Sequence, residues 1–192
     1  MRCVGRDQTQ IVLRDGVAKK SLHHIAMGTA ADEIDGMKQS LEAASVKLED
    51  PPYDGAPDGL WFRDPDGLLV NVSVADNTPA RSSPDPLTNI NGHIHRPNVR
   101  GCSEEPFVAR PRRLGHVLLF TRDVPTKVDF YTRLLGMQLS DTMGGDGVGF
   151  MRNGDGGDHH VIALAKSENP GFHHASFEFG TVDDIGVATA NM

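Results

Sequence analysis

The sequence has 192 residues, of which 38% are hydrophobic and 23% charged, a composition typical of one large folded domain or two small ones. Its formal net charge of −7, with no stripe of Lys or Arg, argues against nucleic acid or an anionic membrane as a partner. No apolar run approaches the roughly 18 residues of a membrane span, and the N-terminus carries no secretory signal. The two cysteines are far apart and form no CxxC pair, so a cytoplasmic location is expected.

The histidines are the unusual feature of the composition, because most of them occur as doublets, His23-His24, His159-His160 and His173-His174. Met1-Arg2 recurs as Met151-Arg152, and His23-His24 recurs as His173-His174 at the same spacing. A fixed spacing that holds over a long stretch rarely arises by chance. The sequence therefore predicts that one structural unit is present in more than one copy.

This unit is clearest in the C-terminal part of the chain. Residues 115–120 form a short β-rich run, and Asp123 followed by Pro125 is typical of a helix N-terminus. Apolar residues at helical spacing continue to Gly136, which predicts the end of the helix. Three predicted strands follow, at 137–143, 148–152 and 160–165. The order of elements in the unit is therefore β-α-β-β-β.

A second such unit is predicted between Leu22 and Val74. Its last two strands are joined by Asp64-Pro65-Asp66-Gly67, a sequence typical of a type I turn. Residues 76–111 are rich in proline and show little periodicity, which indicates an irregular linker. We therefore predict an α+β fold of repeated βαβββ modules. The predicted division is an N-terminal half at 1–75, the linker at 76–111 and a C-terminal half at 112–192.

Strand alternation indicates which histidines share a site, since residues i and i+2 lie on one face of a strand. His116 and His174 stand at equivalent strand starts of two repeats, so pairing of the repeats would bring their imidazoles together. Glu178 lies about 13 Å along the strand from His174, too far for both to bind one ion. His160 is expected to point into the same cavity and His159 away from it. The apolar and polar residues predicted to line that cavity are Leu118, Phe120, Ile162 and Ser176.

These features resemble a known family. The run from Gly115 to Phe120, the segment 130–136 and the turn at 64–67 look like the vicinal oxygen chelate superfamily. The spacing from His116 through the doublet at 159–160 to residues 173–178 resembles its type I extradiol ring-cleaving dioxygenases. This resemblance implies cleavage of a catechol-type aromatic diol with O2 and Fe(II), or Mn(II), by an enzyme that is a homo-oligomer when full length.

The resemblance also implies residue roles. His116 and His174 fall on metal ligands, and His160 falls on the catalytic acid–base histidine. The third ligand of the family is a Glu on the last strand of the last module, which we expect beyond Met192. On this interpretation the chain is a fragment truncated at both ends and is inactive by itself.

The N-terminal half is expected to be structural. Its residues at the corresponding positions, Gln10, His24 and Asn71, include no carboxylate. Two alternative functions belong to the same superfamily. A glyoxalase-like metal-dependent lyase or isomerase takes ligands from both halves, and a non-catalytic ligand-binding module needs no metal.

Overall fold

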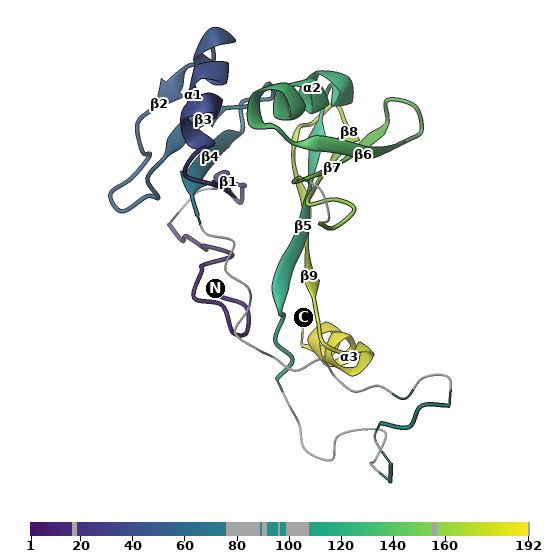
Figure 1. Cartoon of the computed structure of the whole chain (residues 1–192). Helices are drawn as coiled ribbons and strands as arrows, with labels where there is room; N and C mark the ends of the chain where they lie inside the picture. Colours follow the sequence, from purple (N-terminus) through teal and green to yellow (C-terminus); the bar gives the residue numbers. More distant parts are fainter. Residues whose placement is uncertain are drawn as a thin grey trace. The chain divides into compact units, whose positions relative to one another are not determined.

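The first sheet is built by residues 24–74, in the computed structural model drawn in Figure 1. Strand β1 (His24–Thr29) runs parallel to β4 (Leu69–Val74), which pairs antiparallel with β3 (Leu60–Arg63). Strand β3 pairs in turn with the short β2 (Leu48–Glu49), giving the order β1-β4-β3-β2. Helix α1 (Ile34–Ala43) packs against β4. The predicted β-α-β-β pattern is confirmed, and β2 completes the module.

The second sheet has the order β6-β7-β8-β5-β9. Strand β8 runs parallel to β5 and antiparallel to β7, which pairs antiparallel with β6. Helix α2 packs on β6, β7 and β8. The predicted βαβββ order and the α+β class are thus confirmed. The elements are β5 (Arg113–Thr121), α2 (Val124–Leu135), β6 (Gln138–Met143), β7 (Val148–Arg152), β8 (Ile162–Lys166), β9 (Gly171–Glu178) and α3 (Val182–Ala190).

Helix α2 begins and ends where its sequence predicts. The Asp123 carboxylate accepts a hydrogen bond from the backbone N–H of Thr126, which satisfies one of the free amides of the first turn. Gly136 ends the helix with φ of 68°, a left-handed conformation that glycine adopts without steric cost. These local signals fix the ends of the helix that packs between the two sheets.

The structure describes residues 1–16, 19–75, 89, 92–95, 97–98, 108–154 and 157–191. The chain divides into two compact units, Met1–Gly16 with Pro79–Gly115 and Ser176–Met192, and Val17–Thr78 with His116–Ala175. Most of the predicted linker lies outside the described residues, and the division into two halves stays a prediction. Among the described helices, none combines the length and apolar character that crossing a bilayer requires.

The N-terminal segment differs from the repeat that its sequence suggests. Residues 1–16 contain no helix or strand, whereas the matching residues 151–166 contain β8. In place of a strand pairing, the Gln10 and Ile11 amides donate to the Met1 carbonyl and close a loop. A strand needs neighbouring strands to satisfy its backbone groups, and β8 has β5 and β7 on either side.

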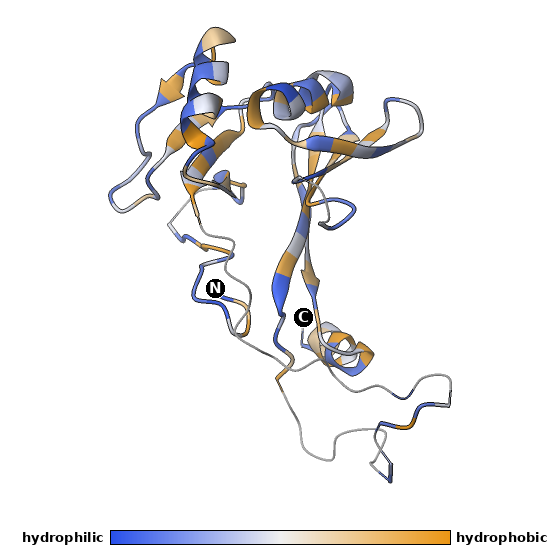
Figure 2. Ribbon diagram, in the orientation of Figure 1, coloured by the Kyte–Doolittle hydropathy of each residue, from blue (hydrophilic) through white to orange (hydrophobic). Residues whose placement is uncertain are grey.

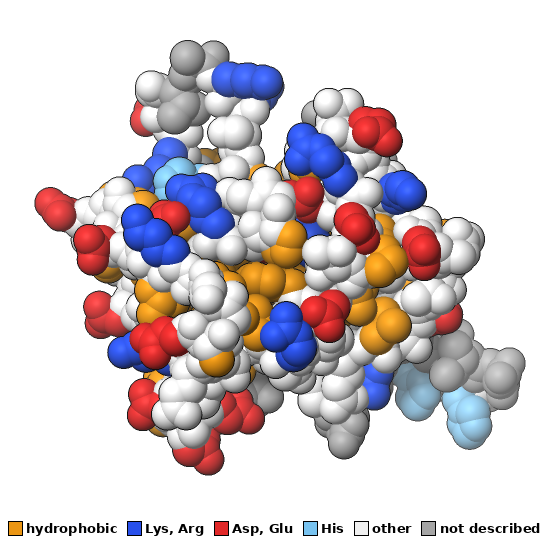
Figure 3. Space-filling model, turned by 90° about the horizontal axis from the view of Figure 1, so that it is seen from above, with side chains coloured by type: hydrophobic (Ala, Val, Ile, Leu, Met, Phe, Trp, Pro, Cys, Tyr) orange, Lys and Arg blue, Asp and Glu red, His pale blue; other side chains and the backbone are white. Residues whose placement is uncertain are grey.

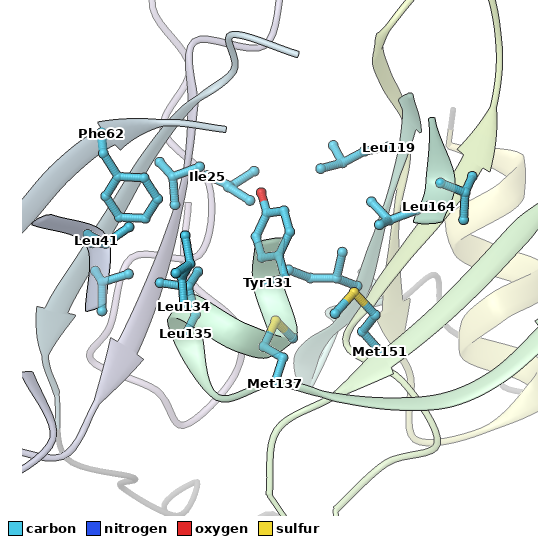
Figure 4. Close-up of a cluster of buried hydrophobic side chains, with 14 residues drawn as sticks. Ile25, Leu41, Phe62, Leu119, Tyr131, Leu134, Leu135, Met137, Met151 and Leu164 are labelled. Carbon is cyan, nitrogen blue, oxygen red and sulfur yellow. The ribbon is translucent and has the colours of Figure 1, made fainter. Parts of the chain in front are cut away.

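One apolar core joins both sheets through the helices. Figure 4 shows the Tyr131 ring between side chains of the first sheet and side chains of the second. Apolar and polar residues alternate along α1 and α2, so each helix turns an apolar face to this core (Figure 2). On the face seen from above, acidic and basic side chains are interspersed around apolar residues (Figure 3). The fully buried residues of the apolar core include Leu41, Phe62, Val70, Leu119, Tyr131, Met151 and Leu164.

A charged cluster is buried at the same junction. The Lys127 side chain is 1% exposed, and its ammonium lies 2.7 Å from an Asp64 carboxylate oxygen and 3.1 Å from an Asp66 oxygen. The Tyr131 hydroxyl donates to Asp64 at 3.2 Å. The other Asp64 oxygen accepts the amides of Asp66 and Leu68, so its turn is held from within. Helix α2 is therefore tied by charge to the turn between β3 and β4.

We expect Lys127→Met to lower the free energy of unfolding by about 3–5 kcal/mol, because it leaves the buried Asp64 carboxylate without its cation. The matched control is Lys38→Met, since Lys38 and its partner Glu42 are half exposed at 3.9 Å. This control is expected to change stability by less than about 1 kcal/mol. Urea unfolding followed by circular dichroism measures both changes, and equal losses in the two variants would contradict the prediction.

Candidate metal-binding and active site

His116 and His174 lie together on neighbouring strands. His116 is on β5 and His174 on β9, which are adjacent in the second sheet. Their Nε2 atoms are 3.1 Å apart, and their rings meet at 72° with centroids 5.2 Å apart. Both residues are partly buried. The expected convergence of the two imidazoles is confirmed, whereas their role as metal ligands stays a prediction.

His160 joins this pair from the segment before β8. Its ring centroid is 4.5 Å from that of His116 and 5.0 Å from that of Phe150. The sequence predicted His160 inside a strand at 160–165, but β8 begins at Ile162. Strand alternation therefore does not determine the side on which His160 lies. His159 is exposed, and its Nδ1 lies 3.1 Å from His160 Nδ1.

The pair of Nε2 atoms fits one metal ion. Two nitrogens that each bind an ion at about 2 Å, at right angles to each other, are about 3 Å apart. The observed separation of 3.1 Å between His116 and His174 meets this condition. Glu178 is not a further ligand here, since its carboxylate forms an ion pair with Arg113. No group of three or more His, Cys, Asp or Glu side chains in the described part of the chain is placed to hold a metal.

Burial and the charge of neighbouring rings lower the pKa of His116 and of His160 and keep both imidazoles neutral near pH 7. Burial lowers the pKa of His116, and the positive charges that His160 and His174 would carry lower it further. Burial likewise lowers the pKa of His160, aided by His159 and opposed by the Asp158 carboxylate. Neutral imidazole is the form that binds a metal or accepts a proton. The electrostatics of the site therefore favour both tasks.

Apolar side chains share the sheet face that carries His116. The register aligns Leu118 with Ala163 and Ala163 with Phe150, so these residues lie on one face of the sheet. Ile162, predicted to line the cavity, is 3% exposed and lies in the core on the other face. This prediction was wrong because it extended the alternation of β8 back to His160. Phe150 is the lining residue that the sequence analysis missed. It follows from alternation along β7, because Phe150 is next to the buried Met151 and its side chain lies on the other face of the strand.

The doublets share a contact that the sequence did not reveal. In each, the Nδ1 atoms of the neighbouring rings approach each other, at 2.9 Å for His23 and His24 and at 2.7 Å for His173 and His174. The His173 ring also packs against Phe120, with centroids 4.8 Å apart. A doublet is therefore a pair of interacting rings, with one ring held by the other.

The N-terminal counterparts have a different environment. The His24 ring packs against Trp61, with centroids 5.1 Å apart. Asn71 is fully buried, and its Nδ2 donates to the Asp58 and Leu60 carbonyls. Its Oδ1 has no hydrogen-bond partner among the described residues. Gln10 lies in the irregular segment. The structural role assigned to this half stays a prediction.

Known proteins provide an independent comparison. The family described as the Glyoxalase/Bleomycin resistance protein/Dioxygenase superfamily matches residues 113–192. The chain is 37% identical over 177 residues to Metapyrocatechase 2 of Cupriavidus necator. The aligned region covers 91% of this chain and 53% of the relative. It is 34% identical over 105 residues to 3-methylcatechol 2,3-dioxygenase of Pseudomonas putida, covering 50% of this chain and 35% of that protein.

A solved structure shares the fold. The Mn(II)-bound glyoxalase of Novosphingobium aromaticivorans matches with a TM-score of 0.63 at 24% identity, covering 90% of this chain and 51% of that chain. The chain thus spans about half the length of the first curated relative and of this solved structure. At this identity the similarity establishes the shared fold.

We expect His116 and His160 in chelator-treated protein to titrate below about pH 6.5, the value of an unperturbed imidazole. His174→Ala should raise the midpoint of His116, because it removes one repelling ring, but burial should keep it below that value. Histidine NMR titration measures each midpoint. His23→Ala, at the residue before β1, is the control and should leave both midpoints unchanged. A His116 midpoint at or above about 6.5 would contradict this account of the site.

Proposed function

We propose that this chain is part of an extradiol dioxygenase, since residues 113–192 match the model of the Glyoxalase/Bleomycin resistance protein/Dioxygenase superfamily. The proposed reaction is cleavage of a catechol-type aromatic diol next to its two hydroxyl carbons, with Fe(II) and O2. The observation that carries the proposal is the 3.1 Å approach of the His116 and His174 Nε2 atoms, with His160 beside them. The similarity to Metapyrocatechase 2 supports the same substrate class.

His116 and His174 are proposed to hold the metal through Nε2. Fe(II) bound there would supply adjacent open positions at which both diol oxygens and O2 bind. An imidazole ligand carries no negative charge, so two of them do not balance a dication. We propose that a carboxylate from outside the described residues completes the ligand set, because Glu178 is committed to Arg113.

His160 is proposed to be the catalytic acid–base residue. Its lowered pKa keeps the ring neutral near pH 7, ready to take the proton of a substrate hydroxyl. The protonated ring then returns that proton later in the reaction. His160 lies beside His116. A substrate bound to a metal ion on His116 and His174 would therefore be close to His160.

The apolar face around the histidines suits an aromatic ring. Phe150 packs against His160, and Phe120 packs against His173. Leu118 shares this face by register. Such side chains exclude water from a bound ring and leave the polar contacts to its two hydroxyl groups.

We also propose that the natural protein is a cytoplasmic homo-oligomer. Sedimentation of the natural protein tests the oligomeric state.

A glyoxalase-like lyase or isomerase is the second candidate. Its support is the family model matched by residues 113–192, whose description includes glyoxalases. That activity needs no O2. Oxygen uptake with a catechol, measured against isomerisation of a thiol adduct of an α-keto aldehyde, separates the two reactions.

We predict that His116→Ala and His174→Ala each abolish stoichiometric Fe(II) binding, because each removes one of two nitrogens that bind the same ion. His160→Ala should retain the metal. Anaerobic titration with Fe(II), followed by metal analysis after gel filtration, measures the binding. His24→Ala is the control from the first sheet. Retention of Fe(II) by both single variants at the two ligand positions would refute the proposed site.

We predict that His160→Ala slows diol cleavage by about 10²–10⁴-fold in the natural protein that contains these residues, the usual contribution of a general acid–base group. The assay follows the yellow ring-opened product that the family resemblance implies. The 192-residue chain alone is expected to be inactive, because no described carboxylate joins His116 and His174 in a group that could hold a metal. If it turned a catechol yellow with Fe(II), the carboxylate would have to come from within it or from a second copy.

A further inference from the structure

Both ring nitrogens of His174 are in contact with other imidazoles. Its Nδ1 lies 2.7 Å from Nδ1 of His173, and its Nε2 lies 3.1 Å from Nε2 of His116. A neutral imidazole carries one N–H, so it donates at one nitrogen and accepts at the other. The three rings therefore form a chain in which the direction of one hydrogen bond determines the direction of the next.

Only one direction of this chain is compatible with a metal on His174. If His173 donates to His174, the remaining proton of His174 lies on Nε2 and points at His116. If His174 donates to His173, its proton lies on Nδ1 and its Nε2 keeps a free lone pair. Binding through Nε2 requires the second arrangement, and a ligating histidine is commonly held in it by an acceptor at the other nitrogen.

We propose that His173 is a positioning residue whose Nδ1 accepts the Nδ1–H of His174 and so keeps the His174 Nε2 lone pair available to the metal. The proposal rests on the ligand role given to His174 in the proposed function. His173 does not touch the ion or the substrate in this scheme. It acts through the protonation pattern and the ring orientation of its neighbour.

The surroundings of His173 suit an acceptor at Nδ1. His173 is exposed, so an N–H on its own Nε2 has access to water as a partner. Its ring packs against Phe120 of β5, with centroids 4.8 Å apart, which limits rotation of the acceptor away from His174. When the metal is absent, the His116 Nε2–H can donate to His174 in the same direction along the chain.

Two substitutions separate acceptor strength from ring packing. His173→Phe keeps an aromatic ring against Phe120 but has no acceptor. His173→Asn loses the ring but places an amide oxygen near the position of Nδ1. His23→Phe is the matched control, since it alters a doublet with the same Nδ1 contact in the first sheet.

The first readout is the tautomer of His174 in chelator-treated chain, from long-range ¹H–¹⁵N NMR of histidine-labelled protein above the titration range. We expect the Nδ1–H form in the unaltered chain, in His173→Asn and in His23→Phe, and a shift towards the Nε2–H form in His173→Phe. An Nε2–H form of His174 in the unaltered chain would overturn the proposal. So would an unchanged tautomer in His173→Phe.

The second readout is Co(II) affinity, measured by visible absorption under anaerobic conditions. We expect His173→Phe to weaken binding about 10–100-fold, and His173→Asn and His23→Phe to change it less than about threefold. Equal weakening by Phe and Asn would assign His173 a packing role and overturn the acceptor role. If the unaltered chain bound no Co(II), the proposed metal site would fail, while the tautomer of His174 would still test His173 separately.

Discussion

The buried ammonium of Lys127 is the contact on which the arrangement of the two modules depends. It lies on α2 and reaches two carboxylates of the turn between β3 and β4, more than 60 residues earlier in the chain. An unpaired charge at this depth would cost several kcal/mol, so the helix and the turn are stable only together. The Tyr131 hydroxyl adds a second link to the same Asp64 carboxylate. Polar contacts therefore fix the position of α2 against the turn between β3 and β4, within a junction that is otherwise apolar.

The histidine site depends on this junction through the second sheet. Helix α2 packs on β7 and β8, and its Val124 and Val128 side chains lie against Gly149 of β7. Strands β5 and β8 are paired in register, so paired residues lie on the same face of the sheet. Along each strand, side chains that face α2 alternate with side chains that face the opposite side. Leu119 then lies in the core, and His116 lies on the other face with Leu118. The packing of one face thus positions the chemistry of the other.

The site brings the two proposed metal ligands, His116 and His174, together with the further imidazoles of His160 and His173. Burial, together with the charge that neighbouring rings would carry, lowers the pKa of His116 and keeps that ring neutral near pH 7. Rings this close also compete for protons, since two Nε2 atoms 3.1 Å apart cannot both carry a hydrogen towards each other. The doublet partner His173 is suited to resolve that competition. If His116 and His174 hold a metal as proposed, its affinity would depend on the neighbours of these ligands as well as on the ligands.

The sequence by itself determined the local elements of this protein. The Asp123 cap, the Gly136 terminus and the turn at residues 64–67 depend on residues within a few positions of each other, so their signals are complete in the sequence. The equivalence of His116 and His174 was also visible as a repeat. Only the tertiary structure decided that Lys127 pairs with Asp64, that Ile162 faces the core and that the rings of each doublet meet. These contacts depend on strand register, on where a strand begins and on packing between segments distant in sequence, and alternation along one strand carries no record of them.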